Sequence, residues 1–204
     1  MVQSLAHSGG NMTGIAYMGV ELIGYRLQLL KESIPKLARI GVLVQKDHPL
    51  RNLMVAETQG AARKLKLAPQ FFEFMPDDSP DKIDAAYTAM SRNGTQAVLG
   101  LPGGIFGRER KRITGLALKY RLPGTFDEGE TIDGGAMMTY NPDSRDNERQ
   151  IAGYIDKILR GAKPGDLPVQ QPTKFKLEIN LRIAKSMGLT IPQSVLLRAE
   201  RVIE

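Results

Sequence analysis

The side chains of this sequence that could do chemistry gather first after its most apolar run. Residues 40–44 are Ile, Gly, Val, Leu and Val, and the next four are Gln45, Lys46, Asp47 and His48. A short run that is apolar on both faces is typical of a strand buried in a parallel sheet. Because ligands bind at the carboxyl ends of such strands, Gln45 and His48 are candidate ligand-binding residues. A second interpretation stays open, in which Asp47 or His48 caps a helix that begins at Pro49.

A second group of titratable residues is acidic and consists of Asp127, Glu128, Glu130 and Asp133. Two of them could act as general acid and base, but carboxylates on a loop are usually solvated. The chain has no Cys, and its two His residues lack metal-ligand spacing, so we expect neither a thiolate nucleophile nor a metal site. No G-x-S-x-G elbow occurs. We therefore predict a protein that is not an enzyme and that needs no metal or cofactor.

The most glycine-rich stretch is LGLPGGIFG, residues 99–107. It lacks both the GK[ST] ending of a P-loop and the GxGxxG spacing of a dinucleotide fold. A plain strand-to-helix turn is the simpler interpretation, and a phosphate-binding loop remains the alternative. Pro102 follows a predicted strand here and is a candidate ligand-binding residue by its position alone.

Composition and charge limit the class of partner. The 204 residues are 42% hydrophobic, enough for a real core, and 28 Lys and Arg against 22 Asp and Glu give a net charge of +6. A basic cluster, RERKR, occupies residues 108–112 near a predicted helix start, where cations oppose the helix dipole. It serves either an anionic partner or a solvated face, and we predict no specific nucleic-acid binding. The longest apolar stretch is about half of the ~20 residues that span a bilayer.

The elements that must position these residues alternate between strand and helix. Strand starts fall about 30 residues apart, which is typical of βαβ units in a parallel sheet with right-handed crossovers. A helix over residues 144–159 is expected to be capped by Asp143 or Ser144 and to bury Ile151, Tyr154, Ile155, Ile158 and Leu159. We predict strands at 15–18, 39–44, 70–75 (an edge or near-edge strand), 97–101, 125–126, 135–140 and around 175–179, and further helices at 21–33, 50–65, 81–92, 107–120 and 180–187.

Several long segments resemble one protein family. They are SLAHSGGNMTG, LPGGIFGRERKRITGLALKYRLPGTF, GGAMMTYNP, GAKPGDLPVQQPTKFKLEINL and AKSMGLTIP. Together they are similar to the ABC-transporter substrate-binding proteins, the family that includes tryptophan- and other aromatic amino-acid-binding members. The resemblance is most specific over residues 161–192. It implies a type I periplasmic-binding-protein-like fold, in which two α/β lobes joined by three crossings hold a small solute between them and deliver it to an ABC permease.

The resemblance also implies a domain organisation and a set of site residues. We expect an α/β three-layer sandwich with a junction or hinge at 1–14, a ligand-binding lobe at 15–136, a crossing strand and helix of the first lobe at 137–168, and a return with C-terminal helices at 169–204. Most of the first lobe and the export signal of the family have no counterpart in this sequence. Phe126, Glu130 and Tyr140 fit the family pattern for ligand contacts. Gln45, His48, Pro102 and Glu128 are placed by position, and the hinge is expected at Gly10, Asn11, Thr13 and Pro172.

Two other functions remain open at this point. One is a cytoplasmic ligand-sensing or regulatory domain of the same fold, and the other is an α/β hydrolase-like enzyme. Family resemblance implies a periplasmic or lipid-anchored protein, whereas the first residues, MVQSLAHSGGNMTG, have no signal-peptide pattern, so the chain taken by itself is expected in the cytoplasm. If the helix over 144–159 evolved to pack on a lobe that is not in this sequence, a homodimer would cover its apolar face.

Overall fold

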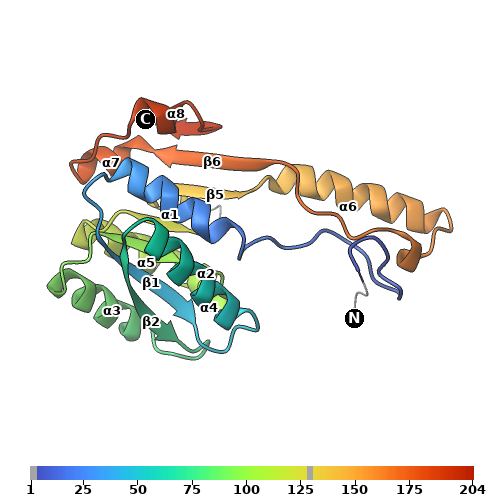
Figure 1. Ribbon diagram of the computed structural model, residues 1–204, viewed down its shortest axis with the longest axis horizontal. Helices are drawn as coiled ribbons and strands as arrows, with labels where there is room; N and C mark the ends of the chain where they lie inside the picture. Colours follow the sequence, from blue (N-terminus) through green and yellow to red (C-terminus); the bar gives the residue numbers. More distant parts are fainter. Residues whose placement is uncertain (1–3, 128–130) are drawn as a thin grey trace. The chain divides into compact units, whose positions relative to one another are not determined.

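A computed structural model describes residues 4–127 and 131–204, and a seven-stranded sheet is its central element (Figure 1). The strand order is β2-β1-β3-β4-β5-β6-β7, which puts β2 at an edge as predicted. The strands are β1 (Arg39–Gln45), β2 (Ala68–Phe74), β3 (Ala97–Gly100), β4 (Gly124–Phe126), β5 (Met138–Pro142), β6 (Phe175–Asn180) and β7 (Arg201–Ile203). The predicted α/β class with a mostly parallel sheet is confirmed.

Strand directions follow from the register. β1 pairs in parallel with β2 and β3, and parallel pairing continues from β3 to β4, from β4 to β5 and from β6 to β7. Between β5 and β6, the Asn180 N–H donates to the Met137 carbonyl and the Asp143 N–H donates to the Lys174 carbonyl, both at 2.9 Å. The higher-numbered residue of one strand thus faces the lower-numbered residue of the other, so β6 runs antiparallel to β5.

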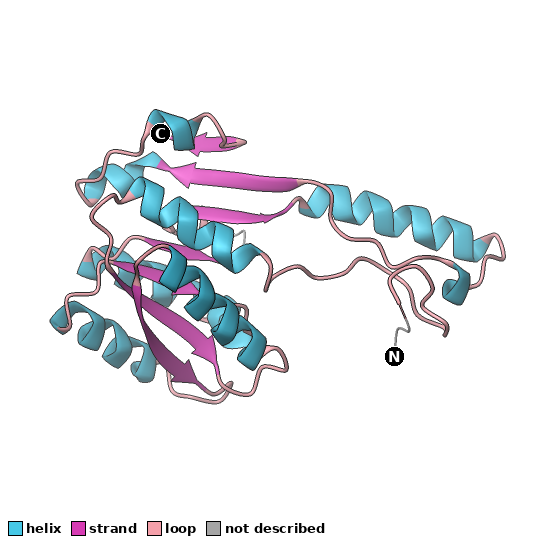
Figure 2. Ribbon diagram, in the orientation of Figure 1, coloured by secondary structure: helices cyan, strands magenta, loops and turns pink. Residues whose placement is uncertain are grey.

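Helices cover both faces of the sheet (Figure 2). One core packs α1 and α2 against one face, and a second core packs α3, α4 and α5 against the other. Alternate residues of β1 enter different cores, since Val42 and Val44 join the first and Leu43 joins the second. The helices are α1 (Leu22–Ser33), α2 (Arg51–Lys64), α3 (Asp81–Arg92), α4 (Gly104–Arg108), α5 (Arg110–Tyr120), α6 (Ser144–Leu159), the 3-10 turn η2 (Pro164–Asp166), α7 (Leu181–Ser186) and α8 (Gln193–Leu196).

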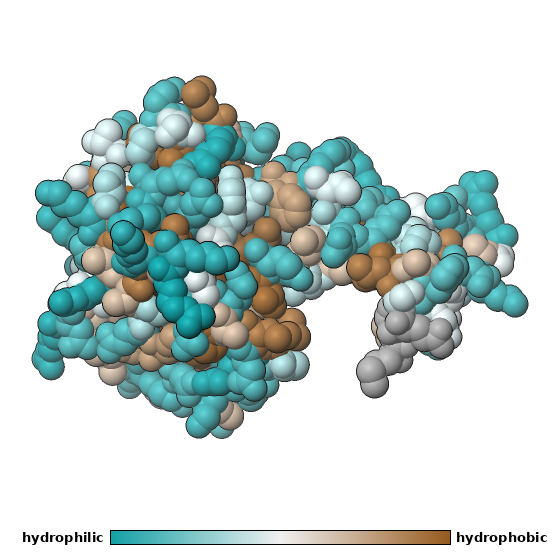
Figure 3. Space-filling view, in the orientation of Figure 1, coloured by the Kyte–Doolittle hydropathy of each residue, from teal (hydrophilic) through white to brown (hydrophobic). Residues whose placement is uncertain are grey.

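The chain forms two compact units. The larger contains Gly19–Asn141 and Lys176–Glu204, and the smaller contains the N-terminal segment to Met18 with Pro142–Phe175. On the face shown in Figure 3, hydrophilic residues dominate the surface and hydrophobic residues appear in smaller groups between them. Among the described residues, no helix combines the length and apolar character needed to cross a bilayer.

Three expectations about the elements need correction. The helix expected over 107–120 is two helices, α4 and α5, that meet at Glu109, and it begins earlier, at Gly104. Residues 15–18 form no strand, because only an isolated bridge joins Ile15 to Gln170. In the helix predicted over 50–65, apolar spacing predicts that Leu53 faces inward, but its side chain on α2 is 60% exposed.

Helix α6 starts as predicted but does not bury its apolar face. The Asp143 carboxylate accepts the N–H groups of Arg145 and Asp146 at 3.0 and 3.4 Å, which confirms the cap. Of the helix residues, Tyr154 alone is buried, and its hydroxyl donates to the Pro168 carbonyl. The expected burial of the other apolar residues is wrong, because Ile158 is only half-buried and the remaining three, Ile151, Ile155 and Leu159, are exposed.

Candidate ligand-binding site

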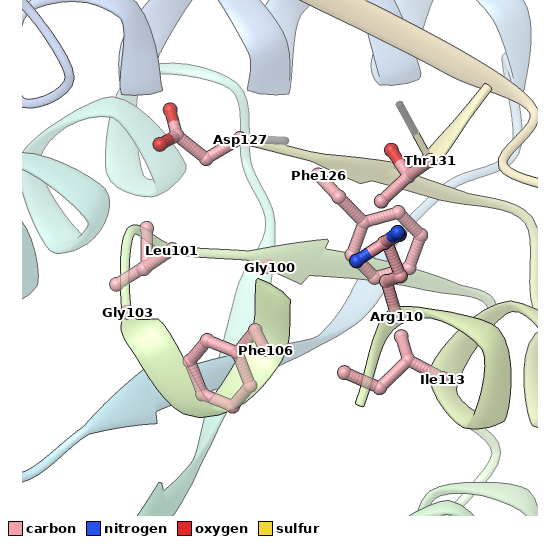
Figure 4. A pocket seen from close by; sticks show the side chains of 9 residues that line it. All are labelled: Gly100, Leu101, Gly103, Phe106, Arg110, Ile113, Phe126, Asp127 and Thr131. Atoms are coloured by element: carbon pink, nitrogen blue, oxygen red, sulfur yellow. The ribbon is translucent and has the colours of Figure 1, made fainter. Parts of the chain in front are cut away.

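A pocket lies at the carboxyl ends of β3 and β4, where the open edge of an α/β sheet usually receives ligands. Its cavity volume is small, about 10 Å³, close to the space that one water molecule needs. Aromatic and aliphatic side chains form most of its wall, and one arginine, one aspartate and one threonine contribute polar groups (Figure 4). The lining residues are Gly100, Leu101, Gly103, Phe106, Arg110, Ile113, Phe126, Asp127 and Thr131, all from the larger unit.

Glycines shape the wall of this pocket because side chains pass close to their backbones. A Cβ at Gly100 would lie 2.5 Å from Cδ1 of Phe126, and a Cβ at Gly103 would lie 2.9 Å from Cβ of Gln45. Gln45 also accepts the Ile105 N–H through Oε1 at 3.3 Å. The glycine-rich stretch is therefore a strand-to-helix turn held by the end of β1, as the simpler interpretation proposed, and Gln45 supports that turn.

Phe126 lines the pocket as a core residue. Its side chain is only 3% exposed and belongs to the core formed with α3, α4 and α5. Phe106, from α4, meets Phe74 edge to face with 5.7 Å between ring centroids, and it forms another part of the wall. The two phenylalanines are thus fixed by packing before any ligand arrives.

Arg110 and Asp127 bring opposite charges to the pocket. Arg110 opens α5, and its Nη1 donates to the Gly107 carbonyl at 3.2 Å. Asp127 follows β4, and Figure 4 shows its side chain turned away from the Phe126 ring. The Asp127 carboxylate accepts Nη2 of Arg26 at 2.6 Å. Arg110 therefore supplies the positive charge of the pocket wall. The carboxylate of Asp127 is instead bonded to Arg26 of α1, which lies on the other face of the sheet.

His48 and Pro102, which were also expected to contact the ligand, do not line the pocket. The Leu50 N–H donates to Nδ1 of His48 at 3.1 Å, so His48 caps the turn before α2. That helix begins at Arg51 and not at Pro49. Pro102 is buried in the turn after β3 and is not among the lining residues. Glu128 and Glu130 lie outside the described residues.

Tyr140, at the end of β5, packs against Tyr25 with ring centroids 4.5 Å apart. Burial, and to a lesser extent the neighbouring Tyr25, raises the pKa of the Tyr140 hydroxyl, so it stays protonated at neutral pH. Its ring is half-buried and is not part of the pocket wall. Tyr140 as a direct ligand contact therefore remains a prediction.

The expected hinge residues all fall in the smaller unit. The Thr13 hydroxyl contacts the carbonyls of Leu167 and Pro168 at 3.1 and 3.2 Å, and Gly10 passes so close to Gly165 that a Cβ there would lie 2.6 Å from the Gly10 oxygen. Asn11 is exposed and Pro172 is buried. These contacts join the N-terminal segment to the segment after α6, and a hinge role is still an expectation.

Several described residues of the acidic and basic clusters bond to other groups of the chain. Asp133 binds Arg201 at 2.7 Å on the surface, whereas Asp127 binds the buried Arg26. Because each carboxylate is bonded to a different arginine, the two do not form an acid-base pair. Arg112 pairs with Asp84, and Arg108 donates to the Pro76 carbonyl. No group of three or more metal-ligating side chains occurs among the residues that the structure describes.

Sequence reasoning missed two polar side chains at the sheet edge. Arg26 of α1 is fully buried, and the side chain of Asn141, after Tyr140 on β5, accepts a hydrogen bond from it. A signal for Arg26 was present, because it shares the helical spacing of Ile23, Leu27 and Leu30, which places a charge on the core face. Arg110 was noticed only as part of the basic cluster.

Comparison with known proteins gives one family. The profile described as "ABC transporter substrate binding protein" matches residues 1–203. A structure from Streptococcus pneumonia, described as an ABC domain in complex with L-Trp, is 25% identical with a TM-score of 0.84, and the match covers 99% of this chain and 68% of that one. Among curated proteins, none matches.

Two further solved structures share the fold. A conserved domain protein from Vibrio cholerae is 23% identical with a TM-score of 0.86, and the match covers 98% of this chain and 66% of that one. A substrate binding protein with adhesive properties from Clostridium difficile, in its ligand-free, open structure, is 18% identical with a TM-score of 0.75 over 99% of this chain and 66% of that one. This chain thus spans about two thirds of the length of these relatives.

Proposed function

Because this chain belongs to the family of ABC transporter substrate-binding proteins, we propose that it binds a small solute with a carboxylate group, such as an aromatic amino acid or organic acid, at the pocket beside β3 and β4. Proteins of this family bind solutes and are not enzymes, and they are typically periplasmic or at the cell surface. We further propose that the bound solute is passed to an ABC permease, and that residues 15–136 act as the ligand-binding lobe.

One observation carries the proposal on ligand class. The pocket has an aromatic wall from Phe106 and Phe126, and the guanidinium of Arg110 stands at the same wall. An apolar body with one convergent cation is a common way to bind a flat solute that carries a carboxylate. The L-Trp complex of the pneumococcal relative supports the same class of ligand.

The test exploits the absence of Trp from this sequence. Excitation of tryptophan reports on the ligand alone, so its fluorescence anisotropy in the presence of increasing protein measures binding directly. We expect the anisotropy to rise with protein concentration, as for weak binding, and the rise to be at least tenfold smaller for Arg110→Met. The matched control is Lys111→Met, which removes an exposed cation from the next position of the same helix. Equal binding by the Arg110→Met protein and the wild type would refute the assignment of this pocket.

A further inference from the structure

The guanidinium of Arg26 ties together two strand ends at the carboxyl edge of the sheet. Its Nε donates to the Tyr140 carbonyl at 3.0 Å, and its Nη2 donates to the carboxylate of Asp127 and to the side-chain oxygen of Asn141. All four residues belong to the larger unit. Arg26 reaches these groups from α1, which packs on the sheet face opposite the pocket helices α4 and α5.

This contact continues the pairing of β4 and β5 beyond its backbone ladder. Within the described part of the chain, these strands pair in parallel at one position, Thr125 with Met138. Two residues further along each strand stand Asp127 and Tyr140, and there the side chain of Arg26 bridges the strands. The strand ends are therefore joined by one buried guanidinium.

The buried polar contacts of Arg26 are not the arrangement that stability alone would favour, which suggests a functional reason for them. Arg26 is fully buried, and a buried charge is costly unless it is well paired. Its Nη1 and the Nδ2 of Asn141 are buried and have no hydrogen-bond partner within the described part of the chain. Leaving buried donors unpaired is unfavourable, and each such group calls for an explanation, of which a functional role of the network is one and a bound water or ion is another.

The positions of the bonded residues indicate that role. Asp127 lines the pocket, and Tyr140 and Asn141 are the last residues of the larger unit before the chain continues at Pro142 into the smaller one. We propose that Arg26 is a positioning residue that holds the pocket wall at Asp127 and the exit of β5 at Tyr140–Asn141 in one arrangement. If the pocket binds a solute as proposed above, the bound solute should further restrain Tyr140–Asn141; this consequence rests on the proposed function.

Hydrogen exchange of the full chain without ligand tests the clamp. The double variant Arg26→Met/Asp127→Asn removes both charges together, so no unpaired buried charge remains to unfold the protein. We expect peptides that cover Met138–Asn141 to exchange at least tenfold faster, while peptides of α3 keep their rates. The single variant Arg26→Lys should show protection between that of the wild type and that of the double variant. Its ammonium keeps the charge but cannot present the planar fork that reaches three acceptors.

The matched control removes another arginine-aspartate pair, Arg112 with Asp84, which joins α5 to α3 at the surface. Arg112→Met/Asp84→Asn should leave the exchange of Met138–Asn141 unchanged. Unchanged exchange in the Arg26 double variant, or a uniform rise over the whole larger unit, would overturn the clamp. If tryptophan does not bind to the wild type, the proposed function fails, whereas the exchange result without ligand still decides the clamp.

Discussion

At the scale of single residues, the pocket wall depends on a close approach between Gly100 and Phe126. Since a Cβ at position 100 would lie 2.5 Å from the buried ring, Gly100→Ala forces the ring or the strand to move. We expect it to lower the free energy of unfolding by about 1–3 kcal/mol, the usual cost of overpacking. Urea unfolding followed by circular dichroism measures this difference.

Gly104→Ala is the matched control for that substitution. Gly104 opens α4, and a Cβ there would meet nothing within 4 Å. Alanine in a helix is favoured over glycine, so this variant should be as stable as the wild type or more stable, by up to about 1 kcal/mol. Equal stability of the Gly100→Ala protein and the wild type would show that the ring is not held as described.

A surface carboxylate offers a prediction on pH. The Lys174 ammonium and, to a lesser extent, the Gln150 amide donate to the Asp146 carboxylate at 2.7 and 2.8 Å, and they lower its pKa below the ordinary 3.8. A lowered pKa in the folded state means that the ion pair stabilises the protein above the unfolded pKa, and that this contribution is lost as the pH falls through the folded pKa.

Carboxyl carbon shifts in an NMR titration should therefore place the Asp146 midpoint below 3.8, and Lys174→Met should raise it. Asp78, whose pKa is lowered mainly by its own hydrogen bond from Lys82, serves as an internal control that should not move. An Asp146 midpoint that ignores Lys174→Met would contradict the ion pair.

Residue types predicted the fold better than they predicted the site. Phe126 was expected to contact the ligand and does line the pocket, but its ring is already packed in the core with α3, α4 and α5. His48 was open to two interpretations, and the capping one describes its contact with Leu50. Arg26 reaches partners more than a hundred residues away in the sequence, and periodicity shows only that its side chain faces the core.

At the scale of elements, α6 presents an apolar stripe that its own unit leaves open. Ile151, Ile155 and Leu159 are exposed at spacings of four, which places them along one side of the helix. Contiguous exposed apolar residues on a soluble protein usually mark an interaction surface. We predict that two copies of this chain associate through these residues, by helix pairing or exchange.

Light scattering at high micromolar protein tests this association. The wild type should give a mass near twice 22.5 kDa, and Ile155→Asp should return it to a monomer. Arg149→Asp, at an exposed position of the same helix, should leave the mass unchanged. A monomeric wild type that binds no hydrophobic dye would contradict the prediction.

Local sequence patterns predicted the elements well where the spacing of apolar residues matches the face that is buried. The helix expected at 81–92 has those bounds in the structure, and it buries residues at helical spacing, namely Ile83, Ala86, Tyr87 and Met90. Prediction failed where tertiary contacts decide. The apolar spacing over 107–120 continues through Glu109, where the structure ends α4 and begins α5, and α6 is amphipathic although its unit buries only Tyr154 of it.

At the scale of the whole molecule, the net charge of +6 does not make a nucleic-acid site. Arg108 and Arg112 of the basic cluster already bind groups of this chain. We predict only weak attraction to duplex DNA that disappears between 50 mM and 200 mM salt, measured by fluorescence anisotropy. Retention at physiological salt that is lost on changing Arg108, Arg110 and Arg112 to Ala would contradict this.

The affinity for a solute should also depend on how much of the solute's surface this protein covers. The pocket is lined by residues of the larger unit, and one wall leaves much of a bound ligand in water. A fully enclosed solute bound near micromolar is stabilised by about 8 kcal/mol, and half of that corresponds to millimolar binding. We therefore predict that calorimetry gives a dissociation constant near millimolar for L-tryptophan with this chain.

Two analogues separate the charges of that ligand. Indole-3-propionate keeps the carboxylate and should bind about as well as tryptophan, because Arg110 stands in the pocket wall. Tryptamine keeps only the ammonium and should bind more weakly, since the Asp127 carboxylate is already bonded to Arg26. Micromolar binding of tryptophan, or a preference for tryptamine, would place the recognising groups elsewhere in the chain.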